Sequence, residues 1–108
     1  MFSIIIPTLN NLKYLEFCLK SLKKNSELNH QIIVHVSEDK NVETRNFLKS
    51  KNINYTFTKE NVGLCTAINI VAKKASSNYL IYAHDDMYFC PGWEKPLIDE
   101  IKSINHKY

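Results

Sequence analysis

Four short runs of β-branched and aromatic residues alternate along the chain with segments whose apolar residues recur at helical spacing. The runs predict strands at Ser3–Ile6, Gln31–Val36, Ile53–Phe57 and Tyr79–Ala83. Between and after them, apolar side chains at intervals of three and four predict four helices that each bury one face. The residues on these faces are Leu12, Leu15, Leu19 and Leu22; Val42, Phe47 and Leu48; Leu64, Ile68, Val71 and Ala75; and Trp93, Leu97, Ile101 and Ile104.

The ends of two elements carry recognisable signals. Pro7 follows the first apolar run directly and is expected to end that strand. Asn41 is expected to cap the second helix, because its side chain can accept a hydrogen bond from the first turn. The run Tyr79–Ala83 is apolar throughout, which is typical of a strand buried on both faces.

Regular alternation of strand and helix with short loops predicts an α/β fold. We expect one domain, residues 1–108, with a Rossmann-like parallel sheet of about four strands in the order 3-2-1-4 and helices on both faces. In such a sheet the loops after all four strands meet at one edge, and a ligand binds where the strand order reverses. Here that crevice lies between the first and fourth strands.

Composition narrows the classes of function. Of the residues, 44% are hydrophobic and 23% charged, as in soluble globular proteins, and the net charge is only +3. No basic stripe with interleaved aromatic residues is present, so nucleic acid is not an expected partner. The odd number of widely spaced cysteines (Cys18, Cys65 and Cys90) suits a reducing compartment, and we expect a cytoplasmic protein.

The candidate chemistry is concentrated where the fourth strand ends. Asp85 and Asp86 follow it directly, and Thr8, Glu38 and Asn61 lie in loops of the same expected rim. Backbone amides at helix starts bind phosphate, whereas adjacent carboxylates repel it. A divalent cation reconciles the two, since carboxylate and phosphate oxygens together suit Mg²⁺ or Mn²⁺.

Four segments in order resemble the donor-binding half of a family 2 glycosyltransferase with the A-type fold. Phe2–Asn10 is similar to the opening strand and loop of that family, and Cys18–Leu22 to its first helix. Asn61-Val62-Gly63, with Ala67 and Asn69 downstream, resembles its Asn-x-Gly segment. Tyr79–Met87 takes the place of its Asp-x-Asp motif.

The resemblance implies a binding role for each matching position. Asp86 would bind a divalent cation, Mn²⁺ or Mg²⁺, that bridges the diphosphate of a nucleotide-diphosphate sugar, with a UDP-sugar as the expected donor. The acceptor would be a saccharide or another hydroxyl compound. The implied nucleotide-sugar-binding residues are Pro7, Thr8, Asn10, Glu38, Asp39, Asn61, Gly63 and Asp85.

The sequence departs from the family pattern at three places. Ser37-Glu38-Asp39-Lys40 stands where the family often has two Asp and a Gly-Ser, so Glu38 and Asp39 remain alternatives for the nucleotide contact. Ile68 stands where an Arg often precedes the Asn, and His84 replaces the first acid of Asp-x-Asp. Two other functions stay open, a non-catalytic nucleotide-binding module and a sugar nucleotidyltransferase-like enzyme.

The resemblance covers only the first half of the family's domain. It implies a truncated A-type fold in which the acceptor half is absent and the general base lies beyond Tyr108. With the order 3-2-1-4, the apolar fourth strand lies at an edge of the sheet and carries no charge to protect it. An exposed apolar edge favours pairing with another chain, so self-association through this edge is expected.

Overall fold

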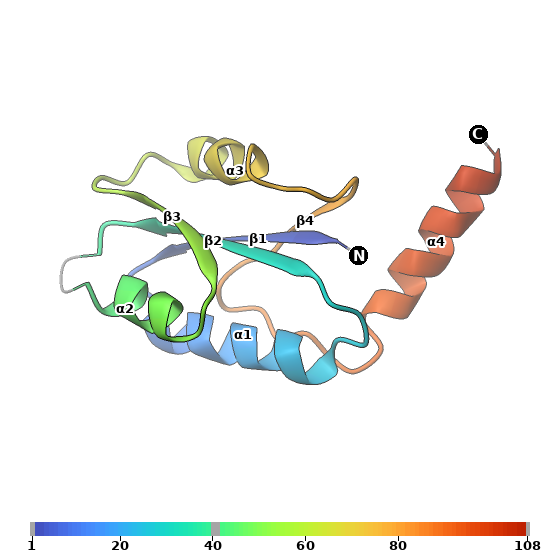
Figure 1. The fold of residues 1–108 in the computed structure, drawn as a ribbon, viewed down its shortest axis with the longest axis horizontal. Helices are drawn as coiled ribbons and strands as arrows, with labels where there is room; N and C mark the ends of the chain where they lie inside the picture. The colour runs from blue at the N-terminus through green and yellow to red at the C-terminus, as the bar shows by residue number, and fades with distance from the viewer. Residues whose placement is uncertain (1, 40–41, 108) are drawn as a thin grey trace.

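The computed structural model describes residues 2–39 and 42–107, in which a four-stranded parallel sheet carries helices on both faces (Figure 1). The strand order is β3-β2-β1-β4, so the expected α/β fold and its order 3-2-1-4 are confirmed. The elements in chain order are β1 (Ser3–Leu9), α1 (Leu12–Asn25), β2 (Gln31–Ser37), α2 (Glu43–Ser50), β3 (Asn54–Thr58), α3 (Leu64–Ala72), β4 (Leu80–Tyr82) and α4 (Glu94–Lys107).

Alternate residues of the central strands bury opposite faces of the sheet. Ile4 and Ile6 of β1 belong to the larger core cluster, which includes Leu15 of α1 and Leu48 of α2. Ile5 points the other way and packs with Ile33 and Val71, on the side that α3 covers (Figure 1). The period of two in β1 therefore places one helix layer on each side of the strand.

The first strand continues through Pro7 to Leu9, so the expectation that Pro7 ends it is wrong. Ser3 N–H donates to the Tyr79 carbonyl and Ala83 N–H to the Ile5 carbonyl, so odd-numbered residues of β1 bond toward β4. Pro7 continues this series at a point where β4 has already ended. Its missing N–H therefore costs no hydrogen bond in the sheet.

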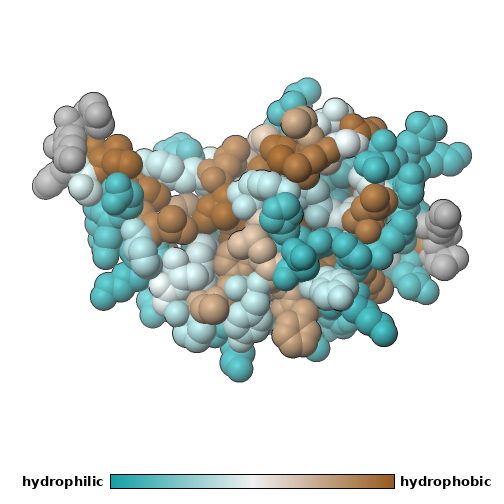
Figure 2. All heavy atoms as spheres, turned by 180° about the vertical axis from the view of Figure 1, so that it is seen from behind, coloured by the Kyte–Doolittle hydropathy of each residue, from teal (hydrophilic) through white to brown (hydrophobic). Residues whose placement is uncertain are grey.

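The fourth strand is short and exposed, which corrects the expectation of a strand buried on both faces. β4 spans three residues, and the side chains of Leu80 and Tyr82 are 49% and 38% exposed. Among the described residues it pairs only with β1, and α4 projects from the body instead of lying along it (Figure 1). The side of the molecule opposite to that in Figure 1 shows hydrophobic surface between α4 and the body (Figure 2).

The last helix is anchored at its first turn. Glu94, which is 3% exposed, accepts hydrogen bonds from the N–H groups of Glu27 and Leu28 and contacts Nε2 of His30. Trp93 packs beside it against the rings of His30 and Phe89. Within the described residues, no helix combines the length and apolar character needed to span a lipid bilayer.

The start of α2 lies next to residues outside the described part of the chain. Asn41, the expected cap, is among these residues. The carboxylate of Asp39 accepts hydrogen bonds from the N–H groups of Thr44 and Arg45, at 3.4 and 3.0 Å. It therefore satisfies donors of the first turn, as a helix-capping side chain does.

Candidate functional site

A hollow of about 240 Å³ lies at the carboxyl edge of the sheet, where the strand order reverses between β1 and β4. It is formed by the ends of β1 and β2, the loop before α3 and the segment after β4. Five of the residues proposed from the sequence line it together: Pro7, Thr8, Asn61, Gly63 and Asp85. The fold thus gathers residues from the end of β1 and from two separate loops at the place expected for a ligand.

Thr8 and Asp85 join the two sides of this hollow. The buried Thr8 hydroxyl donates a hydrogen bond of 2.8 Å to Oδ2 of Asp85. β1 presents Thr8 one residue beyond Pro7, while Asp85 lies in the turn that follows β4. The bond fixes the first of the two adjacent carboxylates against the sheet.

Asp86 differs from its neighbour in its surroundings. Its side chain is exposed, and within the described part of the chain its carboxylate makes no hydrogen bond or ion pair. No group of three or more His, Cys, Asp or Glu residues suited to a metal is found among the described residues. Magnesium and manganese sites that use substrate phosphates take only one or two protein carboxylates, with water and phosphate oxygens completing the shell. Asp86 fits such a cation.

Two helix N-termini open on the hollow. Asn11 precedes α1 and Gly63 precedes α3, both line the hollow, and neither helix has a side-chain cap. Gly63 has φ 85° and ψ 162°, a conformation that only glycine adopts readily, and its N–H donates to Oδ1 of Asn61 at 3.0 Å. The first-turn N–H groups of α3 therefore stay available to an anion.

Glu38 and Asp39 line a separate hollow of about 600 Å³ together with Arg45, Phe57 and Lys59. The side chain of Asp39 is 5% exposed and engaged by Arg45, whose Nε lies 3.2 Å from Oδ2. The Arg45 guanidinium in turn lies 3.8 Å from the ring centroid of Phe57. Glu38 makes a backbone hydrogen bond to Thr58, but within the described residues its carboxylate makes none.

The two carboxylates affect groups beneath and beside them. Burial, together with the charges of Asp85 and Asp86, raises the pKa of the Cys18 thiol to about 11, so this cysteine stays protonated. Burial and the same two charges also raise the pKa of Tyr82, whose hydroxyl lies 3.2 Å from Nδ1 of His84. Negative charge is therefore concentrated at this loop, as a cation site requires.

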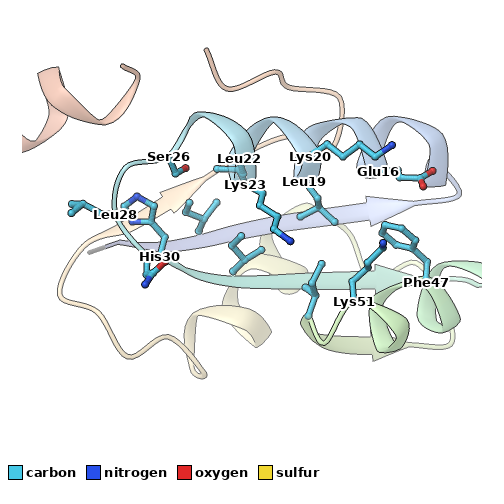
Figure 3. Close-up of a pocket in the computed structure, with 14 residues that line it drawn as sticks. Glu16, Leu19, Lys20, Leu22, Lys23, Ser26, Leu28, His30, Phe47 and Lys51 are labelled. Atoms are coloured by element: carbon cyan, nitrogen blue, oxygen red, sulfur yellow. The ribbon is translucent and has the colours of Figure 1, made fainter. Parts of the chain in front are cut away.

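A third hollow, a groove of about 550 Å³, lies on the other side of the sheet and shares no residue with the hollow beside Asp85. Ile4 and Ile32 belong to its lining, while Lys23 of α1 and Lys51, at the end of α2, extend into it (Figure 3). Among the described residues that line this groove, Glu16 is the only one with a carboxylate. This groove therefore lacks the paired acids of the carboxyl edge.

The structure also places residues that the sequence argument did not single out. Asn11, Ser37 and Tyr82 line the hollow, whereas Asn10 does not belong to its lining. Asn10 has φ 53° in the turn between β1 and α1, where asparagine tolerates the left-handed conformation. Ser37 directly follows the expected strand Gln31–Val36, and this position was a usable signal, since strand ends form the rim.

Comparisons with known proteins agree with this fold. The model of the family described as glycosyl transferase family 2 matches residues 3–108. The fold is similar to S. aureus TarS 1–349 in complex with UDP, with a TM-score of 0.80, 22% identity, and coverage of 94% of this chain and 32% of that one. It is also similar to the mannosyltransferase PcManGT from Pyrobaculum calidifontis in complex with GDP-Man and Mn²⁺. For PcManGT the TM-score is 0.72 at 16% identity, covering 88% of this chain and 30% of that one. The chain therefore spans about a third of the length of these solved chains. The search of curated proteins found no match.

Proposed function

The chain belongs to glycosyl transferase family 2, and we propose that it binds a nucleoside-diphosphate sugar through a divalent cation. The observation that carries this proposal is the pairing of Asp85 and Asp86 with a hollow on which two uncapped helix N-termini open. In this arrangement the helix ends attract the diphosphate, and the cation offsets its repulsion from the carboxylates.

Each residue that lines the hollow or lies next to it has a distinct role in the proposal. Asp86, which follows Asp85 but does not belong to the lining, would hold Mn²⁺ or Mg²⁺, and the cation would neutralise the charge that develops on the departing diphosphate. Thr8 keeps Asp85 turned against the sheet, near the ribose. Pro7 lines the base, and Asn61 and Gly63 shape the loop that exposes the α3 amides. The solved structures with UDP and with GDP-Man and Mn²⁺ support this class of ligand.

The donor is proposed to be a UDP-sugar and the acceptor a saccharide or another hydroxyl compound. The only carboxylate among the described residues that line the hollow is Asp85, and Thr8 engages it. We therefore propose that the general base for the acceptor hydroxyl is a residue other than Asp85. The three cysteines are free, which suits a reducing compartment such as the cytoplasm, the location we propose.

The binding of UDP with and without Mn²⁺, measured by titration calorimetry, tests the site. The wild-type chain is expected to bind UDP more tightly with Mn²⁺, and Asp86→Ala to lose on the order of tenfold or more of that affinity, about 1.4 kcal/mol. Asp99→Ala, which removes an exposed carboxylate of α4, is the matched control. Unchanged metal-dependent affinity in Asp86→Ala would overturn the assignment. Release of UDP from a UDP-sugar when an acceptor is present separates a transferase from a binding module.

A further inference from the structure

One face of α1 is bonded to the segment that carries the two carboxylates. Cys18, Ser21 and Asn25 follow one another at intervals of three and four, so they lie on the same side of the helix. Each of them makes a hydrogen bond to a backbone group of His84 or Phe89, more than 60 residues away in sequence. These bonds reach both ends of the segment 84–89.

The bonds at Phe89 are short and well placed. The Ser21 hydroxyl donates to the Cys18 carbonyl at 2.7 Å and accepts from the N–H of Phe89 at 2.9 Å. Asn25 donates from Nδ2 to the Phe89 carbonyl at 2.7 Å. Phe89 is 6% exposed and lies in no helix or strand, so its backbone groups need side-chain partners.

The other end of the segment is held more weakly, and its middle is held from a different element. Cys18 Sγ lies 3.8 Å from the His84 carbonyl, which also accepts the N–H of Met87 at 3.2 Å and so closes a turn. Asp85 is held by Thr8. Asp86 is thus the carboxylate that the fixed segment leaves without a hydrogen bond among the described residues.

From these contacts we infer that Ser21 and Asn25, with Cys18, are positioning residues for the cation ligand Asp86. The inference rests on the proposed function. A loop ordered during folding loses little conformational freedom when the cation and diphosphate bind, which raises affinity without a direct contact. Ser21 and Asn25 therefore act on metal-dependent binding through the backbone of Phe89.

The test compares Ser21→Ala with Ser50→Ala. Ser50 of α2 donates to the Phe47 carbonyl at 2.7 Å, as Ser21 does to the Cys18 carbonyl, but among the described residues its side chain makes no hydrogen bond to a distant loop. Ser21→Ala is expected to weaken Mn²⁺-dependent UDP binding about three- to tenfold, the loss of roughly one hydrogen bond, while binding without metal stays unchanged. Ser50→Ala is expected to leave both affinities unchanged.

A second variant and a second measurement guard against simple loss of folding. Asn25→Asp keeps the shape of the side chain but removes the donor to the Phe89 carbonyl, and the same selective loss is expected. Hydrogen exchange at the Phe89 amide should become faster in Ser21→Ala, and not in Ser50→Ala. If both α1 variants bind UDP and Mn²⁺ as tightly as the wild type, or if Ser50→Ala shows an equal loss, the positioning role is refuted. If the wild type itself shows no metal-dependent binding, the proposed function fails and the positioning role falls with it.

Discussion

The hydroxyl of Thr8 donates a hydrogen bond of 2.8 Å to the carboxylate of Asp85, across 77 positions of the chain. It connects the end of β1 to the turn after β4, at the point where the sheet reverses its strand order. Of the two neighbouring carboxylates, one is therefore fixed and the other exposed. This difference supports the separate roles that we propose for Asp85 and Asp86.

Replacement of Thr8 by Val is expected to release Asp85. Val has nearly the same shape but no hydroxyl, so a buried partner of the carboxylate is lost at a cost of about 1–3 kcal/mol in the free energy of unfolding. Metal-dependent UDP affinity should fall with it. Thr8→Ser keeps the hydroxyl and should retain both properties. Urea unfolding and calorimetry measure the two effects, and equal behaviour of the Val and Ser variants would contradict the role of the bond.

Glu38 and Asp39 are expected to separate in their effects. Asp39 satisfies the start of α2 and pairs with Arg45, so Asp39→Ala should lower the free energy of unfolding by about 0.5–2 kcal/mol. Glu38→Ala should leave stability unchanged and weaken UDP binding a few-fold, with no change in the metal requirement. Urea unfolding and calorimetry of the two variants check this. Unchanged UDP affinity in both would remove the β2 loop from the site.

Periodicity was sufficient for the elements and their layers because it reports which residues each strand and helix buries. The limits of β1 were not accessible in this way. Whether Pro7 interrupts a strand depends on which neighbour its missing N–H faces, and that is decided by where β4 ends. Leu80 and Tyr82 are in register with Ser3 and Ile5 of β1, so their burial depends on how far α3 extends over that face of the sheet, which the apolar pattern does not report.

The sequence was enough to predict which residues meet at the rim of the candidate site, but not the hydrogen bonds and ion pairs that they form. The carboxyl ends of parallel strands must meet, so Thr8, Asn61 and Asp85 were expected together, and they line one hollow. The pattern of charges could not show that Asp39 forms an ion pair with Arg45, since that pairing depends on how the first turn of α2 lies beside Asp39. The bonds from Ser21 and Asn25 to Phe89 are also invisible in sequence, because they join a helix to an irregular segment.

The anchor of α4 is expected to weaken in acid. Burial alone raises the pKa of Glu94, but the N–H of Glu27, the His30 ring and the N–H of Leu28 outweigh it and lower the pKa below its ordinary value of 4.5. A depressed pKa means that the stabilisation is complete above the unfolded-state pKa and is lost as the pH falls through the folded-state pKa. Thermal unfolding of the wild type should therefore become easier as the pH falls below 4.5.

Glu94→Gln is expected to remove most of this pH dependence and to lower the free energy of unfolding at neutral pH by about 1.5–3 kcal/mol, as charged hydrogen bonds are lost. Glu100→Gln changes an exposed carboxylate of the same helix and is the control. If the acid transition of Glu94→Gln matches that of the wild type, another group is responsible.

The exposed edge of the sheet leads to the last prediction. In the part of the chain that the structure describes, β4 pairs only with β1, and its exposed residues Leu80 and Tyr82 carry no charge. Unprotected apolar edges recruit further strands, so the wild-type chain is expected to self-associate as its concentration rises. Leu80→Lys places a charge on this edge and should shift the chain toward monomer in sedimentation velocity. Tyr14→Lys makes a similar change on the 61% exposed Tyr14 of α1 and should leave association unchanged. A cooperatively folded wild-type monomer at high concentration, or equal dissociation by both variants, would show that β4 is not the contact.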